Sequence, residues 1–346
     1  MNFINRREFL KALSLSISAL ALSHTISACS EATPPPELIP TTHPPTKQVK
    51  QIVGEQTESV EPTSPVEQAT PAQSSELPHL VVARNGEPQE MVRRALAALG
   101  GIERFVAPGS KVVIKPNICV AYHTYEYAAT TNPWVVGALV KLCLEAGAKQ
   151  VQVFDSPFGG TIEEAYNKSG IAEQVKLTGG EMTGMPRFKF KRTDIPDGQD
   201  LLQADIFDDV LNADVLIDVP IAKHHGLAKL TMGMKNLMGV ILNRTSIHHN
   251  MGQRLADLTS KLKPALTVID AVRILVANGP TGGNLADVKQ LNTIIASADI
   301  VAADSYGTTL FGMHPDDLGY IQAASAMGLG SSDLKGMRIE EINVCA

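Results

Sequence analysis

From residue 77 onward, short runs of aliphatic and β-branched residues alternate with stretches of helical periodicity. The apolar runs, which predict strands, lie at 77–85, 109–117, 149–157, 213–220, 265–272 and 291–299. Helices are expected over 87–101, 132–147, 253–263, 299–311 and 315–328, and over part of 161–177. Parallel strands need crossover connections, and strands that are apolar throughout need cover on both faces. The alternation therefore predicts an α/β protein with a mostly parallel sheet and helices on both faces.

Local signals support individual elements of this prediction. Asn132 is a suitable N-cap, Pro133 suits the first position of a helix, and Gly147 suits its end. The segment 187–195 alternates polar and apolar residues, which predicts a peripheral hairpin. Neither GxGxxG nor GxxxxGK[ST] occurs in the chain, so the usual dinucleotide-binding and P-loop folds lose support.

The first 28 residues have the features of an export signal. Arg6 and Arg7 precede a short apolar stretch, and the tetrapeptide ISAC ends at Cys29. The arginine pair resembles a twin-arginine signal, and the tetrapeptide resembles a bacterial lipobox. Residues 1–28 are thus predicted to engage the twin-arginine export machinery, which carries folded proteins. A lipid on Cys29 would then anchor an extracytoplasmic lipoprotein to a membrane. A Sec-type signal with incidental arginines is the alternative.

Residues 29–78 have a different composition from the rest of the chain. They are rich in Pro, Thr, Ser, Glu and Gln, and they contain no aromatic residue. Such a segment buries too little apolar surface to offset its chain entropy, so a disordered tether is expected. The remaining part, residues 79–346, is long enough for one large core or for two joined lobes.

Composition excludes some classes of partner and cofactor. The chain has a net charge of −6 and 5% aromatic residues, which argues against a nucleic-acid partner. After Cys29 only Cys119, Cys143 and Cys345 remain, too few to supply four ligands to an iron–sulfur cluster. No self-contained cluster is therefore expected, and the cofactor is otherwise undetermined.

Polar residues follow four of the predicted strands at the same end. Lys115 and Asn117 follow the second run, and Asp155 follows the third. Lys223 lies just beyond 213–220, and Asp270 lies late in 265–272. Ligands of open α/β sheets bind beyond the carboxyl ends of the strands, so these side chains are expected to share one site.

The richest of these segments carries an unusual charge pattern. No Asp or Glu occurs from Val219 through Ala256, whereas Lys223, Lys235 and Arg244 lie there among glycines and methionines. Lysines supply point charges to carboxylate or phosphate, and glycines allow backbone amides to approach a ligand. The segment predicts an anion-binding site, for which the partner would be a small anionic metabolite. A solvated basic face is the alternative.

Histidines add two further hypotheses. The candidates for a divalent metal site are His224, His225 and His248, together with Asp270. There is no HExxH, and adjacent histidines in a loop do not easily face one ion. General acid–base chemistry near neutral pH is the other role for His224 or His225.

Several motifs resemble a bacterial and archaeal family catalogued as domain of unknown function 362. They are VVIKPN (112–117), ATTNP (129–133), EAGAKQVQVFDSP (145–157), PIAKHH (220–225), MKNLMGVI (234–241), NGPTGG (278–283) and ADIVAADSYG (298–307). The resemblance implies a recurring polar set at Lys115, Asn117, Thr130, Thr131, Asp155, Lys223, His224, Lys235, Asn236, Gly239, Asp270 and Asp304. Some relatives append a ferredoxin-like cluster segment, which this chain lacks. The family has no settled activity.

Three functional hypotheses follow. The first is an exported enzyme of racemase or isomerase type acting on a carboxylate or phosphate, with His224, Asp155 and Lys235 as catalytic residues. Its substrate-binding residues would be Lys115, Asn117, Thr130, Thr131, Lys223, Asn236 and Arg244. The second is a non-catalytic anion-binding lipoprotein. The third is a redox or maturation partner that borrows an iron–sulfur cluster.

Overall fold

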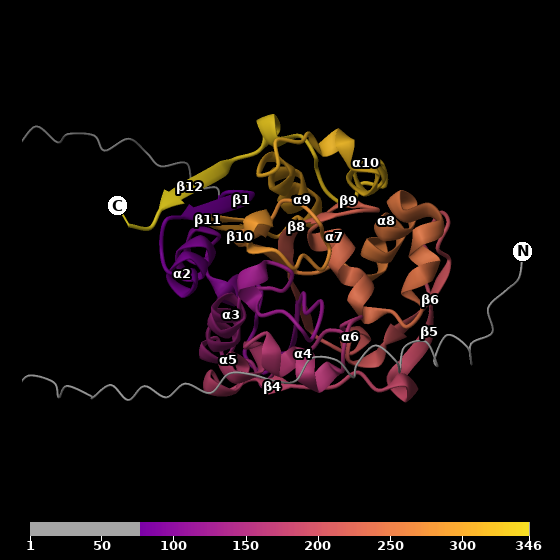
Figure 1. Ribbon diagram of the computed structural model, residues 1–346, viewed down its shortest axis with the longest axis horizontal. Helices are drawn as coiled ribbons and strands as arrows, with labels where there is room; N and C mark the ends of the chain where they lie inside the picture. The colour runs from indigo at the N-terminus through magenta and orange to yellow at the C-terminus, as the bar shows by residue number, and fades with distance from the viewer. Residues whose placement is uncertain (1–76, 346) are drawn as a thin grey trace, which may run out of the picture. The chain divides into compact units, whose positions relative to one another are not determined.

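The structure, a computed structural model, describes residues 77–345 (Figure 1). The predicted signal peptide, Cys29 and the tether up to residue 76 lie outside the described residues. Within the described range, no helix has the length and apolar character that a membrane span requires.

A large mixed sheet forms the centre of the fold. Its strand order is β12 (Ile339–Asn343), β1 (Leu80–Arg84), β11 (Val288–Ser297), β10 (Leu266–Leu275), β7 (Val215–Val219), β2 (Lys111–Pro116), β3 (Gln150–Val153) and β4 (Glu181–Met182). Most pairings are parallel, including β10 with β7, β7 with β2, and β2 with β3. The α/β class and the mostly parallel sheet are confirmed.

Among the eight strands in this order, the exception to parallel pairing is β11, which runs antiparallel to both β1 and β10. The chain passes from β10 to β11 without an α-helix, and a strand that returns directly beside its predecessor must be antiparallel. The apolar run at 291–299 does form a strand, but it begins earlier, at Val288, in a half-exposed part that the hydrophobic pattern did not predict.

Two short strands extend the sheet where the sequence suggested a loop. These are β8 (Ile221–His225) and β9 (Lys229–Thr231), which pair with each other in antiparallel fashion, while β8 also continues alongside β10. A separate two-stranded sheet pairs β5 (Phe190–Asp194) with β6 (Gln203–Phe207). The predicted hairpin within 187–195 was therefore wrong in extent, because only one of its strands comes from that segment.

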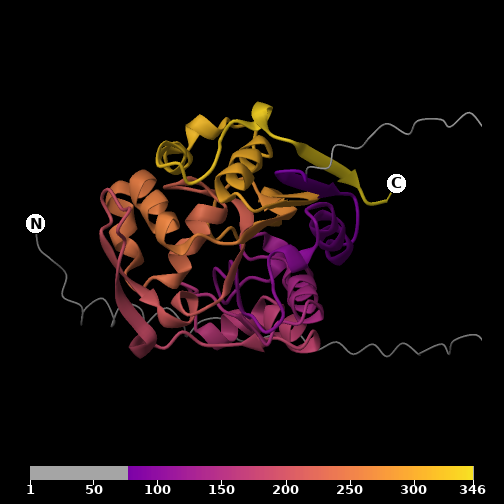
Figure 2. The same cartoon turned by 180° about the vertical axis from the view of Figure 1, so that it is seen from behind.

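Helices lie on both faces of the large sheet (Figures 1 and 2). They are α2 (Pro88–Ala98), α3 (Pro133–Glu145), α4 (Ile162–Lys168), α5 (Ile171–Leu177), α6 (Asp208–Leu211), α7 (Gly233–Asn236), α8 (Met251–Leu262), α9 (Ile300–Thr309) and α10 (Gly319–Ala326). Asn132 caps α3 as predicted, since its side chain accepts a hydrogen bond from the Trp134 amide, and Pro133 begins the helix. In both views α2, α3 and α5 lie across the sheet from α8, α9 and α10.

One main cluster of buried apolar residues joins the sheet to both helical layers. Of the two arrangements that the length allowed, the described residues adopt the single large core. Strands β2 and β7 are almost completely buried, and so is most of β10, which explains their continuous apolar sequence. Their carboxyl ends lie beside β8 and α7, and this junction is where the polar residues gather.

Candidate functional site

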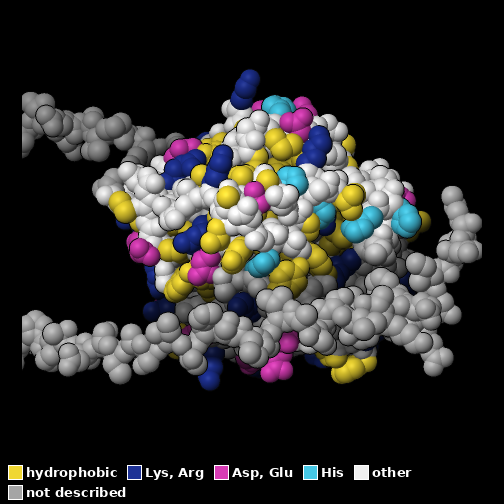
Figure 3. All heavy atoms as spheres, in the orientation of Figure 1, with side chains coloured by type: hydrophobic (Ala, Val, Ile, Leu, Met, Phe, Trp, Pro, Cys, Tyr) yellow, Lys and Arg dark blue, Asp and Glu magenta, His cyan; other side chains and the backbone are white. Residues whose placement is uncertain are grey.

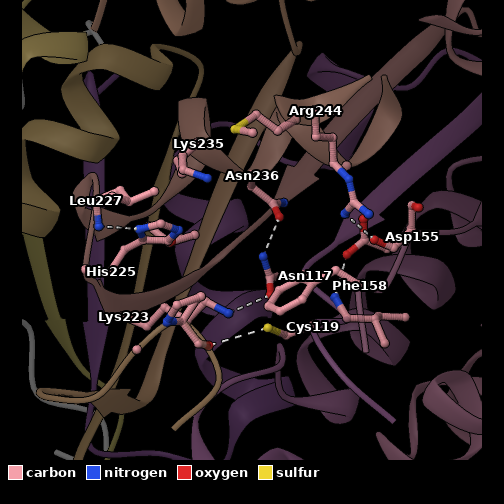
Figure 4. Close-up of a pocket in the computed structure, with 18 of the residues that line it drawn as sticks. Asn117, Cys119, Asp155, Phe158, Lys223, His225, Leu227, Lys235, Asn236 and Arg244 are labelled. Carbon is pink, nitrogen blue, oxygen red and sulfur yellow. Dashed lines mark hydrogen bonds between the residues drawn. The ribbon is translucent and has the colours of Figure 1, made fainter. Parts of the chain in front are cut away.

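A cavity of about 490 Å³ opens at the carboxyl ends of β2 and β3, with β8 and α7 forming its other walls (Figure 4). Its polar lining consists of Lys115, Asn117, Cys119, Asp155, Ser156, Lys223, His225, Thr231, Lys235, Asn236, Arg244, Thr245 and His248. Its apolar lining includes Ile118, Phe158, Leu227, Met238 and Pro280. Of the four strand-end residues expected to meet, Lys115, Asp155 and Lys223 line the cavity and Asp270 does not.

Lys115 is fully buried and serves the cavity as a structural cation. Its ammonium donates to the Pro116 carbonyl at 2.9 Å and to Asn236 Oδ1 at 2.8 Å, and it lies 2.8 Å from Asp155 Oδ1. The other Asp155 oxygen accepts from the Ile118 amide at 2.6 Å. The ammonium therefore makes two hydrogen bonds and one ion pair within the protein, and Asp155 Oδ1 is engaged through that ion pair and not through a hydrogen bond. The sequence had assigned Lys115 to substrate binding and Asp155 to catalysis, but this geometry gives them the task of fixing the cavity floor.

Two asparagines extend this network across the cavity floor (Figure 4). Asn236 Oδ1 accepts from both Lys115 and Asn117, and its amide nitrogen donates to the Lys115 carbonyl and to Asp218 Oδ1. Asn117 Oδ1 in turn accepts from the Lys223 ammonium at 3.0 Å. The predicted pair of asparagines is thus brought together, with every polar atom of the Asn236 amide in use.

Asp218 is a buried member of the site that the sequence analysis missed. It lies on β7 beside Lys115 of β2, is completely buried, and uses only one oxygen, which accepts from Asn236. Loss of solvation raises its pKa well above the ordinary value, although the nearby Lys115 ammonium acts in the opposite direction. Asp218 lies inside an apolar run, and the sequence pattern does not tell whether such an aspartate belongs to a site or only to the edge of a sheet.

Lys223 is also almost fully buried. Its ammonium donates to the Ala129 carbonyl at 2.6 Å as well as to Asn117. Burial lowers its pKa, and the neighbouring Cys119 side chain opposes that effect. Lys223 therefore contributes positive charge to the cavity while most of its hydrogen-bonding capacity is used by the protein.

Lys235 differs from the other two lysines because its ammonium has no hydrogen-bond or ion-pair partner among the described residues, although the side chain is only 9% exposed. It projects from α7 into the cavity (Figure 4). Burial lowers its pKa to about 8, and the positive charges of Lys223 and Arg244 add to this effect. A buried, unpaired ammonium is costly unless a ligand supplies the missing partner.

Asp304 of α9 holds α7 in place. Its two oxygens accept from the amides of Gly233 at 2.6 Å and Met234 at 3.0 Å, the first amides of the helix that carries Lys235 and Asn236. Burial raises the pKa of Asp304 to about 7. The family resemblance implied Asp304 as a polar position, and the structure places it behind the cavity as the cap of α7.

The alternation of β8 decides which histidine faces the cavity. Lys223 and His225, two positions apart, line it, whereas His224 points to the other side of the strand and is absent from the lining. His224 Nδ1 instead accepts from the Gly279 amide at 3.1 Å. The prediction of His224 as a catalytic residue assumed a loop here. Since the segment is a strand, His225 has the position that His224 was expected to have.

His225 is held as a neutral ring. Its Nδ1 accepts from the amides of Leu227 at 3.1 Å and Ala228 at 3.2 Å, so the single ring proton is on Nε2. Burial lowers its pKa to about 3, and the surrounding cations act in the same direction. Nε2 has no partner among the described residues, so His225 can donate a hydrogen bond within the cavity.

Thr130 and Thr131 lie behind the wall and not in it. Thr130 Oγ1 accepts from the Cys119 amide at 3.3 Å. Thr131 Oγ1 accepts from the Asn117 amide at 2.9 Å and donates to the Val219 carbonyl at 2.8 Å. Both threonines are buried, and they fix the loop that carries Asn117 and Cys119. Their predicted role in direct substrate binding is therefore replaced by a positioning role.

Asp270 is likewise committed elsewhere. Its carboxylate accepts from the amides of Asn132 at 2.7 Å and Val272 at 3.0 Å, and burial raises its pKa to about 6. It joins β10 to the start of α3 and does not reach the cavity.

The proposed metal ligands do not converge. His225 and His248 line the cavity, whereas His224 and Asp270 lie outside it. On the face shown in Figure 3, several histidine side chains lie next to hydrophobic ones, and one at the top of the view lies next to acidic side chains. Within residues 77–345, no group of three or more His, Cys, Asp or Glu is arranged to hold a metal ion. The predicted metal set is not assembled by the fold.

Arg244 completes the positive charge of the cavity. Its Nη1 donates to the Ser156 carbonyl at 2.7 Å, and in the described part of the chain its Nε and Nη2 have no partner. The cavity is lined by four Lys and Arg side chains and a single carboxylate, Asp155, which is already paired with Lys115. Among the described residues, the side chains that can still donate hydrogen bonds to a ligand include Lys235, Arg244 and His225, and the Thr231 hydroxyl in the lining has no partner either. The predicted anion-binding character thus rests on fewer residues than the sequence suggested.

One family model covers the part of the chain that forms this cavity. The model of a family described as a domain of unknown function, DUF362, matches residues 112–309, more than half of the chain. The chain therefore belongs to the DUF362 family. That match includes the cavity residues of β2, β3, β8 and α7.

Individual relatives are distant. A thylakoid-associated protein of Synechocystis is 27% identical over 69% of this chain and 74% of its own length. Among solved structures, the lactate racemase apoprotein of Thermoanaerobacterium thermosaccharolyticum matches with a TM-score of 0.40 and 12% identity, over 66% of this chain. A Thermotoga maritima protein matches with a TM-score of 0.37 and 13% identity, also over 66% of this chain. The chain covers 56% and 60% of the length of these two structures.

Proposed function

We propose that this protein binds a small organic anion, a carboxylate or phosphate, in the cavity and moves a proton on it, as a racemase or isomerase would. The single observation that carries this proposal is Lys235, a buried ammonium that faces the cavity and has no partner within residues 77–345. A ligand of opposite charge would supply the partner that the protein does not.

The binding step uses the side chains with free donors. Arg244 offers Nε and Nη2 to one carboxylate or phosphate oxygen pair, which suits the planar geometry of its guanidinium. The protonated form of Lys235 neutralises the same group, and Lys223 and Lys115, which also line the cavity, add positive charge. The apolar walls at Phe158 and Met238 would contact the carbon skeleton.

The chemical step uses the lowered pKa of Lys235. With a pKa of about 8, Lys235 is an ammonium in most molecules near physiological pH and a neutral amine in the rest. In that second fraction Arg244 holds the carboxylate, and the neutral amine can take a proton from the carbon beside it. The negative charge that then develops on the carboxylate oxygens would be stabilised by Arg244 and by the His225 Nε2–H donor. Lys235 thereby takes the role that the sequence gave to His224.

Proton exchange tests the proposal without knowledge of the natural substrate. The purified protein is incubated in D₂O with lactate, alanine and malate, and loss of the α-proton signal is followed by ¹H NMR. Lys235→Met should abolish exchange, whereas Lys191→Met, which removes an exposed lysine of β5, should not alter it. Calorimetric titration with the same acids and with inorganic phosphate measures binding.

The outcomes separate the two leading functions. Binding with Lys235-dependent exchange supports the enzyme. Binding without exchange of any acid would instead support a carrier that captures an anionic metabolite and hands it on. Absence of binding for all carboxylates and phosphate would overturn the proposal as a whole.

We also propose that the protein is exported as a lipoprotein, on the strength of Arg6, Arg7 and Cys29. A relative described as thylakoid-associated is in keeping with a location at a membrane. Replacing both arginines by lysine should leave the precursor inside the cell, and Cys29→Ser should release the protein from the membrane fraction. A Cys29→Ser protein that stays membrane-bound would contradict the lipid anchor.

A further inference from the structure

One nucleophile of the cavity has no part in the chemistry described above. Cys119 follows β2 and lines the cavity with 4% of its surface exposed. We propose that the Cys119 thiol adds reversibly to the carbonyl carbon of a 2-oxo carboxylate that the cavity cations hold. This inference rests on the proposed anion recognition and deepens it by naming a substrate class.

The thiol has a fixed position. The Cys119 amide donates to Thr130 Oγ1 at 3.3 Å, and its carbonyl accepts from the Phe158 amide at 3.1 Å. Its Sγ donates a weak hydrogen bond to the Pro280 carbonyl at 3.4 Å (Figure 4). These contacts hold the sulfur at the wall of the cavity.

The Pro280 segment is itself attached to β8. The Gly279 amide donates to His224 Nδ1 at 3.1 Å, and the Gly226 amide donates to the Gly279 carbonyl at 3.4 Å. A side chain at Gly279 would meet the His224 carbonyl oxygen at 1.8 Å, so only glycine allows this approach. His224 therefore acts on the cavity indirectly, by seating the segment that contacts the thiol.

Two cations lie near the thiol. Lys223 lines the same cavity as Cys119, and the Cys119 side chain acts to raise the pKa of Lys223 against the effect of burial. Lys235, nine-tenths buried and without a partner, faces the same cavity and is the independent sign that an anion binds there. A carboxylate bound by Lys235 and Arg244 would share the cavity with the Cys119 thiol.

The proposed step needs no further reactant. The S–C bond forms as the thiol attacks the carbonyl carbon, and the C=O π electrons move to the oxygen. The thiol proton ends on that oxygen, which gives a thiohemiketal, and the reverse steps release the acid unchanged. Cations around the cavity stabilise the negative charge on the oxygen before it is protonated.

The chain contains internal controls for thiol reactivity. Cys143 is completely buried in α3, and burial raises its pKa to about 12, so it should stay unreactive. Cys345 is exposed at the end of the described chain and does not line the cavity. A comparison of Cys119 with Cys345 in one sample removes differences in reagent and pH.

The experiment compares iodoacetate with iodoacetamide, which are similar in size but differ in charge. Both place an electrophilic carbon beside a carbonyl group, which belongs to a carboxylate in iodoacetate and to a neutral amide in iodoacetamide. The S–C bond forms as the C–I bond breaks, iodide leaves, and the thiol proton passes to solvent. Peptide mass spectrometry of the purified protein gives the alkylation rate at each cysteine. We expect the iodoacetate-to-iodoacetamide rate ratio to be about tenfold higher at Cys119 than at Cys345, because the cavity concentrates anions.

Variants and a second measurement complete the test. Lys235→Met should lower the Cys119 ratio by about tenfold, and Lys191→Met should leave it unchanged. In ¹³C NMR with [2-¹³C]pyruvate, the wild-type protein should show a new signal for a saturated carbon bonded to sulfur and oxygen. Cys119→Ser, with unchanged thermal stability, should lack that signal.

The outcomes distinguish this inference from the proposed function. Equal ratios at Cys119 and Cys345 in a protein that still binds carboxylates would overturn the inference and leave the proposed function standing. A raised ratio without the pyruvate adduct would overturn the substrate class. If no carboxylate or phosphate binds, the proposed function fails and this inference fails with it.

Discussion

The Lys115 ammonium lies 2.8 Å from the Asp155 carboxylate, and neither side chain is more than 5% exposed. The two residues come from the ends of neighbouring parallel strands, and each has further partners within the protein. A buried ion pair of this kind contributes little net stability, but removal of one partner leaves an uncompensated buried charge, which lowers the free energy of unfolding strongly. The pair therefore fixes the relative positions of the loops after β2 and β3.

Removing either partner should destabilise the protein strongly. Lys115→Met or Asp155→Asn leaves one buried group without its counter-charge, for an expected loss of about 3–5 kcal/mol in the free energy of unfolding. The double variant should lose clearly less than the sum, because no unpaired charge remains. Urea unfolding of the four proteins measures the coupling. Strictly additive losses would show that the two groups do not depend on each other.

Gly239 is expected to tolerate no side chain. A Cβ there would lie 2.2 Å from Asp155 Oδ1 and 2.6 Å from Lys115 Nζ, so Gly239→Ala must push the ion pair apart. We expect Gly239→Ala to lower the free energy of unfolding by about 1–3 kcal/mol, the usual effect of overpacking. Gly184→Ala is the matched control, because a Cβ at Gly184 meets nothing within 4 Å. Equal melting temperatures for the two variants would count against this packing.

Much of the fold was predictable from the sequence because its strands are buried on both faces. Continuous apolar runs marked β2, β7 and β10, and standard caps marked α3. The short strands β8 and β9 were missed, since a Lys-His-His segment flanked by glycine has the composition of a loop. The direction of β11 was also outside the reach of periodicity, because alternation does not encode whether a strand pairs parallel or antiparallel.

Lys235 should make the protein less stable at neutral pH. Its pKa of about 8 in the folded protein is below the ordinary 10.5, so the unfolded chain binds more protons between these two pH values. Lys235 therefore lowers the free energy of unfolding by its full amount below pH 8, and this penalty disappears as the pH rises toward 10.5. Lys235→Met should raise the free energy of unfolding by about 3 kcal/mol at pH 7, and this gain should vanish near pH 10.5. A pH-independent difference would contradict the assignment.

Asp304 should affect the site through α7 alone. Asp304→Ala leaves the Gly233 and Met234 amides without acceptors, for a loss of about 2–4 kcal/mol in the free energy of unfolding. Carboxylate affinity measured by calorimetry should fall as well, because Lys235 loses its fixed support. Asp299→Ala removes the equivalent cap of α9 and should reduce stability without changing affinity. If both variants bind equally well, α7 does not depend on its cap.

The sequence predicted which residues form the site more accurately than it predicted what each of them does. Residue chemistry identified Lys115, Asn117, Lys223, Lys235 and Asn236 as neighbours, and the structure brings them together. Which lysine keeps its donors free depends on three-dimensional partners, and no spacing rule separates Lys115 from Lys235. The sequence also does not distinguish a residue that lines the cavity from one that positions the cavity residues. Thr131 is an example, because it holds the Asn117 loop without lining the cavity.

The alternation along β8 limits how this segment can evolve. Lys223 and His225 face inward only because one residue separates them and the strand keeps its register with β10 and β9. Loss or gain of a single codon ahead of Lys223 would turn His224 toward the ligand and both of its neighbours away. Substitutions in β8 change one side chain at a time, whereas an insertion or deletion exchanges the side chains that face the cavity with those that face away from it.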